Sequence, residues 1–311
     1  MQAVNYCFIV NPSAGGGFAG RNWPTLHEKL LATDIPHCHC LSEYRGHSGE
    51  LARSAFDAGL RNFVVVGGDG TANEVLNGLL DAGAEASDIA IGIVPWGTGN
   101  DWASHYKLAP GPEDCVRLLQ SGSCSLQDIG RVTFTDVTGN NRSRYFLNCA
   151  GTGFDSYLLQ AMKTNRGGRF HYLLHVLKCL RKFRATPLQL AMDATHFESP
   201  AMLLEICLGK YAGAGMRFAP AAIADDGLFD ILLIKDMRIT QVLGSLVYLY
   251  NGRINRHWAV KSWRCRSISI ASRAPQRLHC DGELLGQLPV EIEILPRALR
   301  VLVPTSPPPE G

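Results

Sequence analysis

The sequence predicts a two-part protein. Its first part is an α/β domain on a doubly wound parallel sheet, and its second is a mainly antiparallel β-sandwich. Strand and helix patterns alternate through the first third of the chain, and short strands separated by turn clusters fill most of the second half. The length of 311 residues corresponds to about two domains of roughly 150 residues each. Hydrophobic residues make up 46% of the chain and charged residues 19%, a globular composition that excludes a disordered protein.

In the first part, predicted for residues 1–127, the unbroken apolar runs NFVVV and IAIGIVP are typical of strands buried on both faces of a parallel sheet. Each run is followed by a turn rich in glycine and then by a helical pattern. We expect strands over 6–10, 37–41, 62–66 and 89–95, and helices over 23–32, 48–58, 72–80 and 112–120.

In the second part, predicted for residues 128–295, turn residues at 139–141 divide a stretch of strand residues into a hairpin. In VEIEIL, apolar residues alternate with glutamates, as in a sheet with one wet face. We expect a helix over 170–183 and further strands over 187–192, 201–209, 227–234, 267–271, 277–281 and 290–295. Residues 296–311 are expected to return to the first domain.

Charge and targeting patterns exclude several functions. The 30 Lys and Arg residues nearly balance the 28 Asp and Glu residues, so no global field favours nucleic acid. No signal-peptide pattern and no run of 18 apolar residues is visible, which predicts a cytoplasmic protein with peripheral membrane contact at most. The ten cysteines show no zinc-ribbon spacing and are expected to be reduced.

The strongest local signal is GGDGT at 67–71, between a buried strand and a helix. Glycines let the backbone approach a ligand closely, and the free N–H groups of the following helix attract anions. Asp69 would repel a phosphate unless a divalent cation or a proton transfer accounts for it, which favours magnesium-nucleotide chemistry. The alternative is an ordinary turn in which Asp69 and Thr71 cap the helix.

A second signal is PWGTGND at 95–101, which follows the next strand of the predicted sheet. Ligands of open α/β sheets bind beyond the carboxyl ends of the strands, so this loop and GGDGT are expected to share one crevice. Taken alone, the loop is also an acceptable turn with Asn100 or Asp101 as a helix cap.

The first turn, NPSAGGGFAG, offers an alternative function. It contains G-x-G-x-x-G at Gly15, Gly17 and Gly20, with Glu43 downstream, a pattern of nicotinamide-binding proteins. Asn11 and Pro12, however, separate these glycines from the strand. A Walker-type phosphate loop is excluded because Arg21 and Asn22 stand where Lys and Ser or Thr are needed.

Three further clusters contain metal-ligating or charged residues. The run HCHC at 37–40 is on a predicted strand, where alternate side chains point to opposite faces, so a metal site is disfavoured. His171 and His175 lack the glutamate of a zinc-protease motif. The basic residues around the helix over 170–183 fit either a solvated surface or contact with an anionic membrane; they are Lys163, Arg166, Arg169, Lys178, Arg181, Lys182 and Arg184.

Seven segments in order resemble one family: NPSAGGG, SEYRGHSGELA, VVVGGDGTANEVLNGL, PWGTGNDWA, NCAGTGFD, FAPAAIADDGLFDILLI and HCDGELLG. They are similar to the diacylglycerol kinase catalytic-domain family, which includes sphingosine, ceramide and bacterial lipid kinases. The resemblance covers nearly the whole chain. It implies that ATP and an acceptor lipid meet between an α/β domain and a β-sandwich, and that the γ-phosphoryl group passes from ATP to a lipid hydroxyl.

The resemblance also implies roles for individual residues. Asp281 and Glu283 match an acidic pair that supplies the general base, and Asp69 matches an acidic residue placed on magnesium and phosphates; the choice of base among the three is left open. Ser42 stands where many relatives have Thr. The residues implied to line the nucleotide site are Asn11, Ser42, Gly67, Gly68, Asp69, Gly70, Thr71, Ala72, Asn73 and Thr98.

By the same resemblance, IADDGLFD would bind a structural magnesium ion through the Asp226 carboxylate and the carbonyls of Ile223 and Leu228. The alternative for this segment is a plain turn before a strand. One departure concerns the first glycine turn, where family members often carry a basic residue. Here Gly16 and Gly17 occupy that place, and Arg21 follows further on.

The predicted function is therefore an ATP-dependent lipid kinase with magnesium as cofactor and diacylglycerol or a related lipid as acceptor. Two alternatives stay open: another hydroxyl lipid, such as phosphatidylglycerol or a sphingoid base, or a nucleotide-binding regulatory relative that no longer transfers phosphate. The expected partners are a lipid at a membrane surface and, as an open alternative, a second copy of the chain.

Overall fold

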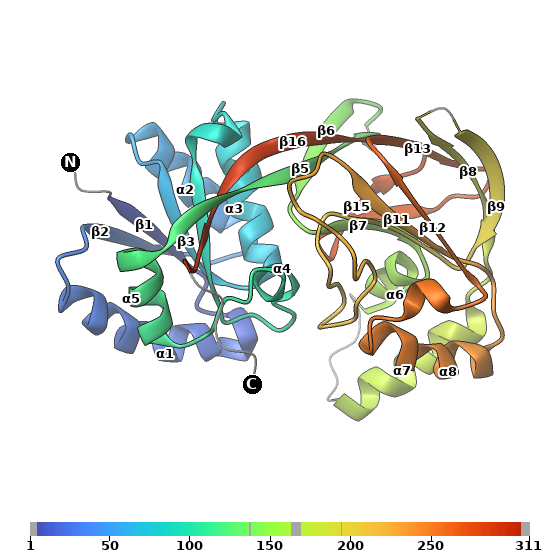
Figure 1. The fold of residues 1–311 in the computed structure, drawn as a ribbon, viewed down its shortest axis with the longest axis horizontal. Helices are drawn as coiled ribbons and strands as arrows, with labels where there is room; N and C mark the ends of the chain where they lie inside the picture. The colour runs from blue at the N-terminus through green and yellow to red at the C-terminus, as the bar shows by residue number, and fades with distance from the viewer. Residues whose placement is uncertain (1–4, 137, 163–168, 194, 306–311) are drawn as a thin grey trace.

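The computed structural model describes residues 5–136, 138–162, 169–193 and 195–305. Figure 1 shows an N-terminal domain of strands flanked by helices beside a larger C-terminal domain dominated by strands, and two long strands, β5 and β16, run from one domain into the other. The predicted fold class, an α/β domain followed by an antiparallel β-sandwich, is confirmed.

The N-terminal domain is built on a parallel sheet in the order β2-β1-β3-β4. Both faces of this sheet are covered by helices, which explains why its inner strands consist of apolar residues on both faces. The elements are β1 (Tyr6–Val10), α1 (Ala14–Leu31), β2 (His37–Leu41), α2 (His47–Asp57), β3 (Asn62–Gly67), α3 (Asp69–Asp81), η1 (Ala86–Asp88), β4 (Ala90–Pro95), α4 (Asp101–His105) and α5 (Pro112–Ser121).

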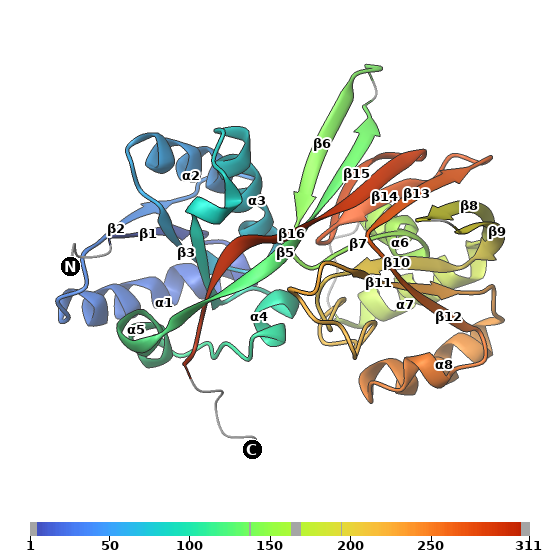
Figure 2. The ribbon, with the colours of Figure 1, turned by 45° about the horizontal axis from the view of Figure 1, so that its top comes forward.

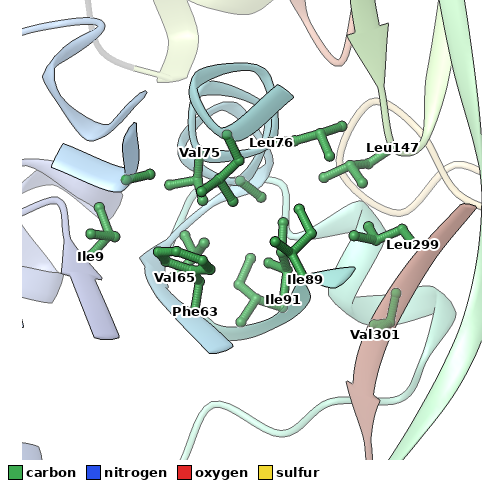
Figure 3. Close-up of a cluster of buried hydrophobic side chains, with 14 of the residues drawn as sticks. Ile9, Phe63, Val65, Val75, Leu76, Ile89, Ile91, Leu147, Leu299 and Val301 are labelled. Atoms are coloured by element: carbon green, nitrogen blue, oxygen red, sulfur yellow. The ribbon is translucent and has the colours of Figure 1, made fainter. Parts of the chain in front are cut away.

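Helix α3 packs against one face of the parallel sheet and buries its apolar side chains. Figure 3 shows Val75 and Leu76 of this helix packed over Phe63, Val65 and Ile91 of the central strands. These side chains are fully buried or nearly so. Complete burial of such a side chain contributes about 1.5–3 kcal/mol, so the cluster fixes α3, and with it the loop that precedes α3, against the sheet.

The C-terminal domain packs two sheets face to face, with α6, α7 and α8 on the far side of the smaller sheet (Figure 2). The smaller sheet has the order β12-β11-β10-β7-β14-β15. The elements are β5 (Ser123–Thr135), β6 (Asn141–Phe146), β7 (Cys149–Gly153), α6 (Phe154–Met162), α7 (Arg169–Lys182), β8 (Thr186–Met192), β9 (Thr195–Ala201), β10 (Leu203–Cys207), β11 (Phe229–Ile234), α8 (Ile239–Tyr250), η2 (Ile254–Arg256), β12 (Val260–Cys265), β13 (Ser267–Ser272), β14 (Arg277–Cys280), β15 (Glu283–Gln287) and β16 (Val290–Val303).

The larger sheet continues through both domains. β5 and β16 pair in antiparallel fashion along almost their whole length, with an irregularity between Leu295 and Leu299. Beyond it, β16 lies parallel to β4, with Arg300 opposite Ala90 and Val301 opposite Ile91. The two domains are therefore joined by two paired strands, which restrict their relative movement more than a single linker would.

The predicted helices and strands are present, and most of their ends differ by a few residues. Two differ more: α1 begins at Ala14 rather than at residue 23, and β16 continues to Val303 rather than ending at residue 295. Sequence patterns did not predict β7, β9, β12, β15, α4, α6 or α8. α8 consists mostly of apolar residues on all sides, so it lacks the periodicity that identifies a surface helix. None of the helices in the described part of the chain is long and apolar enough to cross a membrane.

Candidate active site

The loops that follow β3 and β4 meet at the carboxyl edge of the parallel sheet, as the sequence predicts. A Cβ atom on Gly97 would lie 2.3 Å from the Cα atom of Gly68, so the two backbones touch and neither position accepts a side chain without movement. We call the surface formed by residues 11–17, 67–71 and 95–101 the glycine-loop edge. In open α/β sheets this edge is where ligands bind.

Asp69 fixes the second loop against the first. Its carboxylate accepts hydrogen bonds from the backbone N–H groups of Asp101, at 3.1 Å, and Trp102, at 2.9 Å. These amides open α4, so Asp69 caps that short helix from another element. Asn100, with φ of 57°, closes the same loop by accepting a hydrogen bond from the Gly97 N–H at 2.9 Å.

The first glycine turn is tied to the same edge by Asn11, whose amide donates to the Thr71 hydroxyl at 3.0 Å. Gly15, Gly16 and Gly17 all have positive φ, a conformation that favours glycine. Arg21 reaches back from one turn further along α1 and donates to the Gly16 carbonyl at 3.3 Å. Arg21 therefore places a positive charge at the turn that lacks a basic residue of its own.

The N-terminus of α3 is shaped to receive an anion. No side chain caps this helix, and a Cβ atom on Gly70 would meet no other atom within 4 Å. Free N–H groups and open space are what a phosphate group requires at a helix N-terminus. Thr98 lies exposed in the neighbouring loop, and Ser42 is buried where β2 ends, with its N–H bonded to the Val10 carbonyl.

Two residues that the resemblance assigns to the nucleotide site point elsewhere in this structure. Ala72 is fully buried in the core of the N-terminal domain. Asn73 donates to the Tyr145 carbonyl at 2.9 Å and to the Asp281 carboxylate at 2.8 Å. Both side chains face the protein interior and not the glycine-loop edge. Direct contact of Ala72 or Asn73 with a nucleotide stays a prediction.

The turn of residues 281–283, which we call the acidic turn, contains two carboxylates in opposite surroundings. Asp281 is buried, and its oxygens accept hydrogen bonds from Asn73 and from the backbone N–H groups of Leu147, Asn148 and Cys149 at 2.8–3.0 Å. Burial raises the pKa of Asp281, while these donors oppose the rise. Asp281 thus binds the start of β7 to α3.

Glu283 faces outward between arginines of both domains, with 21% of its side chain exposed. Arg45, from the loop after β2, donates to it at 2.8 Å, and a guanidinium nitrogen of Arg144, from β6, lies 3.6 Å away. Arg144 also donates to the Asn73 side chain at 3.1 Å. Sequence analysis missed both arginines because no motif connects them with the acidic turn.

The turn implied to bind structural magnesium has a different partner. The Asp226 carboxylate is ion-paired with Arg264 of β12, and its other oxygen accepts the Leu228 N–H at 3.1 Å. Ile223 is 52% exposed. Because Arg264 already balances the charge of Asp226, this arrangement does not fit a divalent cation, and magnesium at these three residues stays a prediction from the resemblance.

A second charged cluster, not predicted, is buried behind the acidic turn. Asp155 and Glu205 both lie against the Nε2 atom of His279, which precedes the turn on β14. Burial alone would lower the pKa of His279, but the two carboxylates raise it well above its usual value. Burial and Asp155 raise the pKa of Glu205 to about 8. The signal in the sequence was Glu205, a lone acid in the apolar strand LLEIC.

The remaining predicted clusters do not join this site. In the described part of the chain, His37 and His39 pack against the His27 ring, and the 37–40 run forms no convergent group of metal-ligating atoms. Lys163 and Arg166 lie outside the described residues, as do the side chains of Arg169 and His171. The other basic residues of this region are exposed: Lys178, Arg181, Lys182 and Arg184.

Comparison with known proteins identifies the family. The diacylglycerol kinase catalytic domain matches residues 5–132, and the YegS C-terminal NAD kinase beta sandwich-like domain matches residues 149–303. The chain thus consists of a diacylglycerol kinase catalytic domain followed by a YegS-type β-sandwich domain. The resemblance drawn from the motifs is therefore confirmed.

Individual relatives agree with this family. A diacylglycerol kinase of Staphylococcus saprophyticus is 25% identical over 301 residues, which cover 96% of this chain and 95% of the relative. A crystal structure of a diacylglycerol kinase from Bacillus anthracis has a TM-score of 0.72 at 20% identity and covers 98% of both chains. Yeast NADH kinase complexed with NADH has a TM-score of 0.56 at 10% identity, over 98% of this chain and 85% of the other. The two solved structures show the shared fold alone.

Proposed function

We propose that this protein transfers the γ-phosphoryl group of magnesium-ATP to a hydroxyl group of diacylglycerol or a related lipid. One observation carries the proposal beyond family membership. The helix whose N-terminus opens toward the glycine-loop edge also holds the acidic turn, through the 2.8 Å hydrogen bond from Asn73 to Asp281. A phosphate site and a carboxylate on a separate domain are therefore held at one helix, as transfer between two substrates requires.

Positioning and charge neutralisation are the main tasks of a protein in phosphoryl transfer. The free N–H groups of α3, near Gly70, would bind phosphate oxygens, and Arg21 would add a positive charge at the first turn. Asp69 keeps the two loops in contact, and its carboxylate would help to hold the magnesium ion that accompanies ATP.

We assign the proton acceptor to Glu283 rather than Asp281. A general base must lie within hydrogen-bond reach of the proton that it removes. Both oxygens of Asp281 are buried and already accept four hydrogen bonds, whereas Glu283 is partly exposed and ion-paired with Arg45 and Arg144. Asp281 then acts as a positioning residue that orients Glu283 two residues further on.

The acceptor lipid is the less specific part of the proposal. Family membership and the names of the relatives favour diacylglycerol, while no described side chain distinguishes its hydroxyl from that of phosphatidylglycerol or a sphingoid base. The regulatory alternative rested on the missing basic residue in the first glycine turn. Arg21 supplies that charge, which favours the enzyme.

The test is a radiolabelled γ-phosphate transfer assay with magnesium-ATP and detergent-dispersed diacylglycerol, monoacylglycerol, phosphatidylglycerol or sphingosine. A labelled lipid with wild-type protein, and none with Asp69→Asn, is the expected result. ATP binding without any labelled lipid would contradict the kinase and support the regulatory alternative. A fully active Asp69→Asn variant would contradict the site.

A further inference from the structure

The helix α8 exposes its apolar residues and buries a polar one. Leu243, Leu246, Val247 and Tyr250 are 45%, 38%, 64% and 57% exposed. Their spacing of i, i+3, i+4 and i+7 places them along one side of the helix. Ser245, in contrast, is 5% exposed and hydrogen-bonded to His257 at 2.9 Å. We call these four residues the apolar stripe.

A normal surface helix buries its one apolar side, whereas α8 buries Leu249 and exposes a further apolar side. Trp258 follows η2, is 64% exposed and lies near α8, because its ring packs against His257, which in turn contacts Tyr248. Contiguous exposed apolar surface on a soluble protein marks a place of contact with another molecule or with a membrane. Packing within the chain does not account for the stripe, because Leu249 and Ser245 already provide the buried side of α8.

Charge around the stripe indicates what covers it. From Met237 to Cys280 the sequence contains eight Lys and Arg residues and no Asp or Glu, although the chain as a whole is nearly neutral. Exposed Asp236, directly before this stretch, is the acidic residue nearest to α8 in the sequence. Arg238 lies exposed at the N-terminal end of α8, Arg253 and Arg256 lie exposed after its C-terminal end, and exposed Arg217 is bonded through its N–H to the Leu249 carbonyl. The apolar stripe is thus bordered by cations at both ends.

We propose that the apolar stripe and Trp258 insert into the surface of a membrane rich in anionic lipids, with the bordering arginines bound to lipid headgroups. A helix with exposed Leu, Val and aromatic side chains between basic residues is typical of helices that lie in the plane of a bilayer. Tyr and Trp rings prefer the boundary between headgroups and acyl chains. With 12 residues, α8 lies in the interface and does not span it.

A second copy of the chain fits this surface less well. A two-fold dimer through α8 would bring the same arginines of both copies close together, and like charges repel. An anionic bilayer would instead present negative charge to these arginines and attract them. Helices α7 and α8 both lie on the outer side of the smaller sheet (Figures 1 and 2). The exposed residues Lys178, Arg181 and Lys182 of α7 therefore add positive charge on the side of the domain that carries α8.

The link to catalysis rests on the proposed lipid acceptor, because an enzyme held at a bilayer meets a lipid substrate in its own phase. The binding itself is tested without ATP or turnover, so failure of the surface and failure of the kinase are distinguishable.

The experiment is co-flotation of the full chain with vesicles of phosphatidylcholine alone or with about one-third phosphatidylglycerol. Val247→Glu places a charge in the stripe, and Leu31→Glu is the matched control, because Leu31 is 65% exposed on the N-terminal domain. We expect wild type and Leu31→Glu to bind the anionic vesicles and Val247→Glu to bind at least tenfold more weakly. We also expect Arg253→Glu with Arg256→Glu to lower binding most at low salt, since salt screens such contacts.

Three results would overturn the proposal. They are wild type that does not float with anionic vesicles, Val247→Glu that floats like wild type, and a wild-type dimer in light scattering that Val247→Glu converts to a monomer. The last result would assign the stripe to a second copy of the chain. Thermal unfolding of the variants checks that Val247→Glu, an exposed position, keeps the fold.

Discussion

The glycine-loop edge and the acidic turn are joined through Asn73 of α3 but are built in different ways. The edge depends on backbone approach: two glycines touch, and one carboxylate caps a neighbouring helix. The acidic turn depends on side chains that come from distant parts of the chain, including Arg45, Asn73 and Arg144. The first arrangement is encoded locally, and the second exists only once both domains have folded.

This difference predicts different responses to substitution. Changes at the edge should act mainly on nucleotide binding, and changes at the acidic turn should divide between folding and catalysis according to which carboxylate is altered.

Asp281→Ala should lower the free energy of unfolding by about 4 kcal/mol, roughly 1 kcal/mol for each donor that loses its acceptor. Those donors are Asn73 and the backbone of Leu147, Asn148 and Cys149. Urea unfolding measures the loss. Glu283→Ala is the matched control and should cost about 1 kcal/mol or less, because its ion pair with Arg45 lies at the surface. Equal losses in the two variants would remove the distinction between the carboxylates.

Gly97→Ala should separate the two loops, because the new methyl group would lie 2.3 Å from the Gly68 backbone. We expect a lower thermal midpoint and at least a tenfold loss of kcat/KM for ATP. Gly70→Ala, where a Cβ meets no other atom within 4 Å, should keep the midpoint and only raise KM for ATP. If Gly97→Ala bound ATP like wild type, contact of the loops would not matter for the site.

Arg21→Gln should raise KM for ATP about fivefold, the effect of losing roughly 1 kcal/mol of charge-assisted hydrogen bonding, and should leave kcat nearly unchanged. Arg117→Gln is a control because Arg117 is also on the N-terminal domain and its side chain is 70% exposed. Steady-state kinetics with varied ATP gives both constants. An unchanged KM in Arg21→Gln would show that its contact with Gly16 is structural only.

Glu205→Gln should have almost no effect on stability near pH 5 and an increasing one toward pH 8. The pKa of Glu205 is raised to about 8, so its neutral form stabilises the fold and this contribution is lost as the pH rises from the usual range of a glutamate to about 8. Gln keeps the neutral form at every pH, so the variant should become more stable than wild type as pH increases. If the free energy of unfolding changed by the same amount between pH 5 and pH 8 in wild type and in Glu205→Gln, this expectation would be contradicted.

Sequence reasoning predicted the elements and motifs whose signals are local. The apolar strands 62–67 and 90–95, the loops that follow them and the meeting of these loops all follow from short patterns in the chain. It did not predict the arginines beside Glu283 or the partner of Asp226, because those contacts join residues 38 to 238 positions apart. It also missed α8, because apolar residues lie on most sides of this helix and leave no clear helical period in the sequence.

We propose that Glu283 accepts the proton of the lipid hydroxyl while Asp281 holds Glu283 in place. The direct measurement is kcat and KM for ATP of Glu283→Gln in the γ-phosphate transfer assay, with unfolding measured beside it. We predict a fall in kcat of about 100-fold or more, as expected for the loss of a general base, with KM for ATP and stability close to wild type. A variant that keeps its kcat, or that loses only ATP affinity, would contradict the assignment.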